Sequence, residues 1–171
     1  MLSALWRESP YSYLKKGQNC LTMASLLHED SKGEAFIKYV IKASGLNIST
    51  WIEKYLNAYL KPILHCFYAY ELVFMPHGEN VILIMENHFP VGILMKDITE
   101  EVIVFNQDLS FNEHSKRLYV QAEDHMKVLT IFTDVFDSFF RFLVPILHQS
   151  MDFKEDSFWK LVAESVKQYQ M

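Results

Sequence analysis

The sequence predicts an α+β fold that is mainly helical and carries one small antiparallel hairpin sheet. Half of the 171 residues are hydrophobic and 15% are aromatic, which indicates a folded chain with a substantial core. Five glycines and five prolines are few for this length, which favours long helices over many tight turns. Two short aliphatic runs, at residues 81–85 and 91–95, supply the hairpin. A chain of this length is expected to form a single domain, residues 1–171.

Two helices are expected in the first third of the chain. Residues 21–28 have a short helical pattern, and a polar break at residues 30–33 follows it. Residues 34–44 have apolar side chains at i,i+4 spacing, as one face of a helix requires. Gly45 is suited to the C-cap because glycine adopts the left-handed conformation without strain.

The strongest helix prediction begins at Thr50. Thr50 and Glu53 fit a capping box, with threonine at the N-cap and glutamate three residues later. Pro62 is expected to kink or divide this helix, because proline lacks an N–H and clashes with the preceding turn. The apolar residues that recur at helical spacing are Ile52, Leu56, Tyr59, Ile63 and Phe67.

The hairpin is expected to follow a loop at residues 75–80. Glu86 to Pro90 should form the bridge between its two strands, and residues 102–105 could add a third strand. A hairpin of this size is not stable alone, so it should pack on helices.

The last third of the chain is predicted to be helical after a polar loop at residues 106–116. A buried helix is expected at residues 122–148, and an amphipathic helix at residues 158–169 closes the chain. The apolar stripe predicted for the buried helix consists of Val128, Phe132, Val135, Phe139 and Phe142.

Charge and composition argue against several classes of function. The net charge of −5, without a basic block, disfavours nucleic-acid binding. The most apolar stretch, residues 128–148, contains Asp134, Asp137 and Arg141, which argues against a membrane span. The two cysteines show no metal-ligand spacing, and the chain start lacks the pattern of a signal peptide. A reducing compartment, the cytoplasm, is therefore expected.

The candidate chemistry lies at the two ends of the predicted hairpin. His77-Gly78-Glu79-Asn80 precedes its first strand, and Lys96-Asp97 follows its second strand. Because the two ends of a hairpin meet, the amide of Asn80 and the carboxylate of Asp97 are expected to lie close together. Such oxygen ligands suit Mg²⁺ carried on the phosphates of ATP. His77 would contact a phosphate or a substrate carboxylate.

This segment resembles the C-terminal part of the NRPS-independent siderophore synthetases, the IucA/IucC family. Members carry a His-Gly-Gln-Asn signature, then a hairpin, then Arg-Asp; this chain has His77-Gly78-Glu79-Asn80 and Lys96-Asp97. Further stretches similar to family segments lie at residues 3–10, 51–62 and 158–162.

The resemblance implies that the chain is the C-terminal, kinase-like palm portion of a larger ligase. Members use Mg·ATP to adenylate a carboxylate, commonly of citrate, and an amine or hydroxyl then attacks the acyl-adenylate. His77 would be the catalytic residue, and Asn80 and Asp97 would hold Mg²⁺. The residues implied to bind the nucleotide and the carboxylate are His77, Glu79, Asn80, Lys96 and Asp97. A homodimer, or association with the missing N-terminal half, is compatible with the resemblance.

Two departures from the family pattern leave alternatives open. Glu79 stands where members carry Gln, and it adds a negative charge beside the phosphates. Lys96 stands where members carry Arg, and it lacks the planar fork that grips a carboxylate or phosphate. Members are also several times longer, and their His-Pro-x-x-Lys motif is absent here. The alternatives are a small-molecule kinase lobe of the aminoglycoside phosphotransferase type and a non-catalytic remnant or interaction module.

Overall fold

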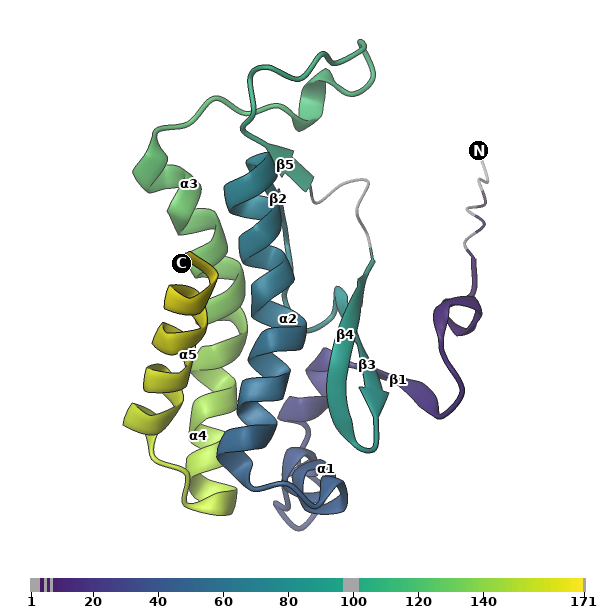
Figure 1. The fold of residues 1–171 in the computed structure, drawn as a ribbon, viewed down its shortest axis with the longest axis vertical. Coiled ribbons are helices and arrows are strands. Elements are labelled where there is room, and N and C mark those ends of the chain that lie inside the picture. The colour runs from purple at the N-terminus through teal and green to yellow at the C-terminus, as the bar shows by residue number, and fades with distance from the viewer. Residues whose placement is uncertain (1–3, 5, 7, 97–101, 171) are drawn as a thin grey trace.

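The computed structural model, which describes residues 4, 6, 8–96 and 102–170, confirms a mainly helical α+β fold (Figure 1). The longest helix, α2, lies between a helical layer and a small sheet; it contacts α5 on one side and β4 on the other. The helices are α1 (Phe36–Ser44), α2 (Ile48–Tyr70), α3 (Asp124–Ile131), α4 (Arg141–Met151) and α5 (Glu155–Gln170). The strands are β1 (Gln18–Thr22), β2 (Leu72–Phe74), β3 (Val81–Glu86), β4 (Phe89–Met95) and β5 (Val102–Val104). Within the described ranges, each helix lacks either the length or the apolar character that crossing a membrane demands.

The N-cap of α2 lies three residues earlier than the sequence predicted. Its N-cap is Asn47, whose side-chain oxygen accepts a hydrogen bond from the Thr50 N–H at 2.9 Å, so the Thr50 capping box was wrong. The helix runs unbroken through Pro62, so of the two predicted effects, a kink or a division, the division does not occur. Tyr59 and Ile63 are buried on either side of the exposed proline, and this packing outweighs a penalty of about 3 kcal/mol.

The hairpin sheet has three strands in the order β1-β3-β4, all antiparallel. Its third strand is β1, which pairs Gln18 with Glu86 and Thr22 with Ile82, although a helix was expected from Leu21. The predicted strand near residue 102 exists as β5, but it pairs with β2 in a separate two-stranded sheet. The prediction was therefore wrong about which strand completes the hairpin sheet.

β3 and β4 are joined by a tighter turn than the predicted bridge from Glu86 to Pro90. Only Asn87 and His88 lie between the strands, and both have positive φ angles of 47° and 64°, as a type I′ turn requires. Pro90 belongs to β4, opposite a register shift between Ile84 and Met85. The irregularity is expected there, because proline has no N–H for the ladder.

α3 and α4 are joined without a break by a π-helical stretch, Phe132–Phe140. The predicted apolar stripe is therefore only partly correct: Val135 and Phe139 are buried, whereas Val128, Phe132 and Phe142 are about half exposed. A π-helix has more residues per turn than an α-helix, so the buried positions do not follow the α-helical register. The buried residues instead recur every four positions, at Ile131, Val135, Phe139, Leu143 and Leu147.

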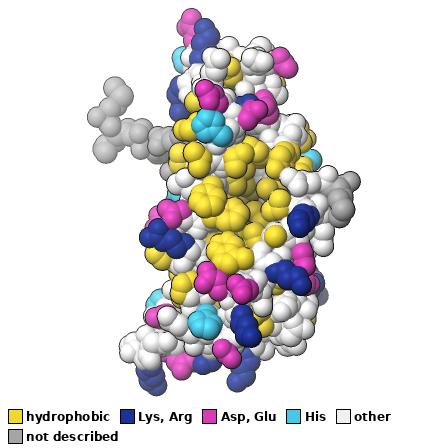
Figure 2. All heavy atoms as spheres, turned by 90° about the vertical axis from the view of Figure 1, so that its left-hand side faces the viewer, with side chains coloured by type: hydrophobic (Ala, Val, Ile, Leu, Met, Phe, Trp, Pro, Cys, Tyr) yellow, Lys and Arg dark blue, Asp and Glu magenta, His cyan; other side chains and the backbone are white. Residues whose placement is uncertain are grey.

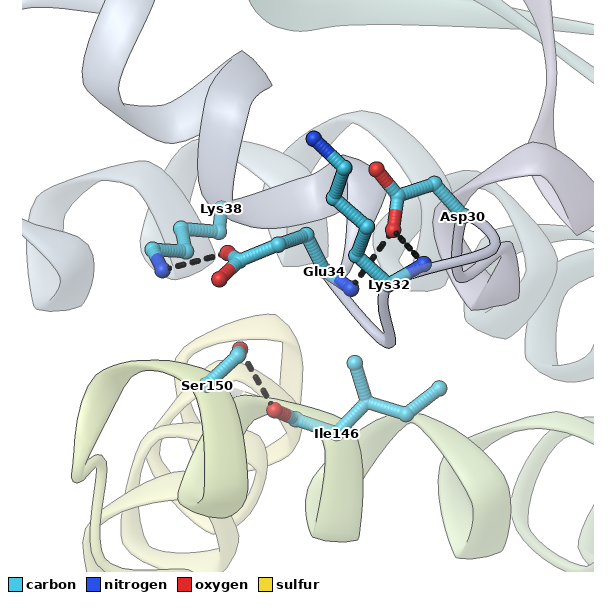
Figure 3. Close-up of polar contacts among 6 residues, drawn as sticks. All are labelled: Asp30, Lys32, Glu34, Lys38, Ile146 and Ser150. Carbon is cyan, nitrogen blue, oxygen red and sulfur yellow. Dashed lines mark hydrogen bonds and ion pairs between the residues drawn. The ribbon is translucent and has the colours of Figure 1, made fainter.

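The turn before α1 is closed by side chains (Figure 3). The Asp30 carboxylate accepts hydrogen bonds from the Lys32 and Glu34 N–H groups at 2.8 and 2.9 Å, and Glu34 pairs with Lys38 at 2.6 Å. α1 then packs on α4, where the Ser150 hydroxyl donates to the Ile146 carbonyl at 2.6 Å. Gly45 ends α1 with a φ of 70°, which confirms the predicted C-cap.

The helical layer leaves an apolar surface on the face that includes α3 and α5 (Figure 2). Leu129 of α3 and Phe132, at the start of the π-helical stretch, are about half exposed. The rings of Phe132, Phe136 and Trp159 stack in sequence, with centroids 5.3 and 6.0 Å apart. These rings line a groove of about 480 Å³ between the π-helical stretch and α5.

Candidate functional site

The loop between β2 and β3 carries the predicted site residues His77, Glu79 and Asn80. Their burial differs: His77 is half-buried, Glu79 is exposed, and Asn80 is only 5% exposed. In the described part of the chain, Asn80 is the one buried residue with a polar, non-aromatic side chain. Buried polar groups need hydrogen-bond partners, and these partners fix the geometry of the loop.

Asn80 is held within the loop by three hydrogen bonds. Its side-chain Nδ2 donates to the Met75 carbonyl at 3.2 Å and lies 3.1 Å from Nε2 of His77. Its backbone N–H donates to the His77 carbonyl at 3.0 Å. A cation would be bound through Oδ1, because the NH₂ group of an amide is only a donor. His77 Nε2 acts as an acceptor in this arrangement, so Nδ1 carries the proton and is the atom that can donate to an anion.

The two ends of the hairpin meet beside Asn80. Val81 pairs with Met95 at the open end of the hairpin, and the Lys96 N–H donates to the Asn80 carbonyl at 2.9 Å. His77, Asn80 and the backbone of Lys96 are therefore brought together, as expected from the hairpin. Asp97 lies outside the described residues. The ligand-binding and catalytic roles of this set stay predictions.

The oxygen donors predicted for this site, from Asn80 and Asp97, are of the kind that binds a metal ion carried on a phosphate. Within the described ranges, no three His, Cys, Asp or Glu side chains gather where they could hold a metal ion. Mg²⁺ is commonly bound through one or two protein oxygens together with substrate phosphates. The amide oxygen of Asn80 and the carboxylate chemistry of Asp97 suit that mode.

Two contacts that support the loop were not predicted from the sequence. The Tyr59 hydroxyl donates to the Pro76 carbonyl at 2.6 Å, and the Ala24 N–H donates to the Gly78 carbonyl at 2.8 Å. Burial raises the pKa of Tyr59 well above its usual value, so the hydroxyl remains a donor at ordinary pH. Tyr59 was placed in the apolar stripe of its helix, and no spacing in the sequence relates it to the loop.

Arg141 could bind a carboxylate by its charge, but it is paired within its own helix. Its Nη1 lies 2.7 Å from Oδ1 of Asp137, one helical turn earlier. Such an i,i+4 pair is an ordinary feature of a helix surface.

Comparisons with known proteins cover nearly the whole chain. Residues 49–171 match the family described as "Ferric iron reductase FhuF-like transporter". Over 170 residues, 99% of the chain, the sequence is 50% identical to putrebactin synthase of Shewanella sp. (strain MR-4). Over 173 residues it is 31% identical to aerobactin synthase of Vibrio mimicus. The chain spans 27% and 29% of the lengths of these relatives.

Solved structures share the fold. Aerobactin synthetase IucC of Klebsiella pneumoniae matches with a TM-score of 0.89 at 24% identity, over 96% of this chain and 31% of that one. The petrobactin biosynthesis protein AsbB of Bacillus anthracis matches with a TM-score of 0.87 at 19% identity, over 96% and 30%. The ATP-bound aerobactin synthetase IucA of Klebsiella pneumoniae matches with a TM-score of 0.76 at 16% identity, over 88% and 29%. The chain therefore belongs to the FhuF-like family and is related over nearly its whole length to the siderophore synthetases of the IucA/IucC type.

Proposed function

We propose that this chain is the nucleotide-binding palm portion of a siderophore synthetase. The reaction would join a citrate-like carboxylate to an amine or hydroxyl at the expense of ATP. The observation that carries the proposal is the meeting of His77, Asn80 and Lys96 at the base of the hairpin. It is supported by 50% identity to a putrebactin synthase across 99% of the chain.

The proposed chemistry begins with activation of the carboxylate. A carboxylate oxygen attacks the α-phosphorus of ATP, the bond between the α-phosphorus and the bridging oxygen breaks, and pyrophosphate leaves. The amine or hydroxyl then attacks the acyl carbon, loses its proton and releases AMP. Mg²⁺ would neutralise phosphate charge, which is the main catalytic demand of such transfers.

Each residue of the candidate site has a defined part in this proposal. Asn80 Oδ1 and the Asp97 carboxylate would hold Mg²⁺, which would supply positive charge beside the phosphates. His77 donates from Nδ1–H to an oxygen on which negative charge develops. The ammonium of Lys96 attracts phosphate or carboxylate as a point charge. Glu79 is exposed, so water screens its unfavourable charge.

The rest of the site would come from further polypeptide. The chain spans under a third of the putrebactin and aerobactin synthases that it matches. We therefore propose that residues 1–171 form one unit, which supplies the hairpin side of the nucleotide site. Other phosphate and substrate contacts would lie in the part of a synthetase outside the matched region.

Calorimetric titration with Mg·ATP tests the proposal. The chain should bind Mg·ATP, and Asp97→Ala should abolish binding, because the metal loses its charged ligand. Asp108→Ala, which removes an exposed carboxylate from a different loop, is the matched control and should bind normally. Failure of the folded, unmutated chain to bind would contradict the proposal.

The products of turnover separate the proposed ligase from the alternatives. With citrate, a diamine and the remaining part of a synthetase added, a ligase releases pyrophosphate and AMP. A kinase lobe would release ADP, and a non-catalytic remnant would release neither.

A further inference from the structure

The loop that carries His77 is fastened to the protein through every second carbonyl. Three neighbouring groups hold these carbonyls: the Tyr59 hydroxyl at Pro76, the Ala24 N–H at Gly78 and the Lys96 N–H at Asn80, at 2.6, 2.8 and 2.9 Å. The three donors come from α2, from the 3₁₀ helix Met23–Leu27 and from the end of β4. Pro76, Gly78 and Asn80 are buried, whereas His77 and Glu79 between them are half-buried and exposed.

Gly78 lies directly on the aromatic core. A Cβ atom at this position would come within 2.9 and 3.0 Å of the Phe139 ring and 3.1 Å of the Ala24 Cα, which is closer than side chains tolerate. The requirement for glycine is therefore one of space. The Phe139 ring is 1% exposed and forms the floor beneath the loop.

The π-helical stretch explains why the Phe139 ring lies beneath the loop. Consecutive residues of a π-helix lie closer together around the axis than those of an α-helix, so Phe139 and Phe140 can both face inward. Phe140 packs edge-on against Tyr59 at 6.0 Å, while Phe139 approaches Gly78. One pair of adjacent rings thus contacts both the tyrosine that holds the loop and the loop itself.

We propose that Tyr59, Gly78 and Phe139 are positioning residues for the nucleotide site, acting through His77 and Asn80. They fix the loop backbone so that Nδ1–H of His77 and Oδ1 of Asn80 are placed before the nucleotide arrives. The inference rests on the proposed function for its catalytic meaning. Its structural part is that Tyr59 and Gly78 fix the position and the tautomer of the His77 ring. This part can be tested without a nucleotide.

The chain offers a matched control for each substitution. Tyr59→Phe removes the hydroxyl that holds Pro76. Tyr55→Phe removes an equally buried hydroxyl from the same helix, and among the described residues that hydroxyl donates to the Met23 sulfur, at 3.2 Å, and not to the loop. Gly78→Ala introduces the clash with Phe139, whereas Gly92→Ala would meet its nearest neighbour, Ile84, at an ordinary 3.7 Å.

The readouts are the ¹⁵N NMR spectrum of the His77 ring and the Kd for Mg·ATP. The His77 signals are identified by their absence in His77→Gln. In the unmutated chain we expect an unprotonated Nε2 and a protonated Nδ1 at pH 8. Tyr59→Phe and Gly78→Ala should average the two tautomers and weaken Mg·ATP binding by about tenfold, within the range for supporting residues of metal sites. Tyr55→Phe and Gly92→Ala should change neither readout.

The two readouts, the His77 spectrum and the Kd for Mg·ATP, separate this inference from the proposed function. Absence of Mg·ATP binding in the unmutated chain would contradict the proposed function, and the His77 spectra would still decide the inference. Spectra of Tyr59→Phe and Gly78→Ala that match those of their controls would overturn the inference, whatever the nucleotide result. If Tyr59→Phe does not fold, the comparison of Gly78→Ala with Gly92→Ala decides it.

Discussion

Replacing Asn80 by alanine should destabilise the protein far more than replacing an exposed asparagine. The change removes side-chain hydrogen bonds to the Met75 carbonyl and to Nε2 of His77. Each such bond contributes about 1 kcal/mol, and leaving the two buried or half-buried acceptors unpaired adds to the loss. The expected decrease in unfolding free energy is therefore roughly 2–4 kcal/mol. That is a large share of the 5–15 kcal/mol typical of a domain.

Urea denaturation followed by circular dichroism measures this loss. With an m-value of about 2 kcal/mol/M, the midpoint should fall by roughly 1–2 M without a change in slope. Asn57→Ala is the control, because Asn57 is exposed on α2 and alanine favours a helix, so its midpoint should stay or rise slightly. A decrease for Asn80→Ala no larger than that for Asn57→Ala would refute the assigned hydrogen bonds.

Three further predictions concern the fold. Asn47→Ala should lower the unfolding free energy by about 1 kcal/mol in urea denaturation, because it removes the N-cap of α2. Thr50→Ala should lower it clearly less. A larger loss for Thr50→Ala than for Asn47→Ala would contradict Asn47 as the N-cap and support Thr50. Hydrogen bonds from the Glu34 and Lys32 N–H groups lower the pKa of Asp30, so its stabilising effect is present above the unfolded pKa of about 3.9 and is lost as the pH falls through the lower folded value. Thermal melts from pH 2 to 6 should therefore show less acid sensitivity in Asp30→Ala than in the parent, and parallel curves would contradict this. Leu129→Lys should reduce concentration-dependent self-association in light scattering, because it places a charge among exposed apolar side chains of the helical layer such as Phe132, whereas Lys42→Glu, at an exposed position of α1, should not.

Local features of the sequence were sufficient to predict several elements of the fold. Gly45 marks the end of α1 because glycine tolerates the left-handed conformation found there. The aliphatic runs at residues 81–85 and 91–95 correspond to β3 and β4, since their composition suits a pleated, half-buried surface. The proximity of Asn80 to Lys96 followed from the hairpin itself, because its two open ends must meet.

Other elements depend on contacts that the sequence does not display. β1 has no clean alternation of buried and exposed residues, and it becomes a strand only because β3 offers a free edge. Asn47 and Thr50 are both good N-cap residues, so local chemistry left the start of α2 open to two choices. The register after Phe132 could not be predicted, because an α-helical period was assumed where the chain forms π turns.

In the candidate site, too, some features follow from local sequence and others depend on distant contacts. His77 and Asn80 lie three residues apart and carry recognisable chemistry, so the sequence identifies them and their neighbourhood. What orients them is a set of backbone carbonyls held by Ala24 and Tyr59, with the ring of Phe139 beneath. A carbonyl acceptor is present at every residue, so nothing in the sequence marks Pro76 or Gly78 as the ones that are held. The candidate side chains are therefore recognisable in the sequence, while the backbone geometry that orients them is decided by residues distant along the chain.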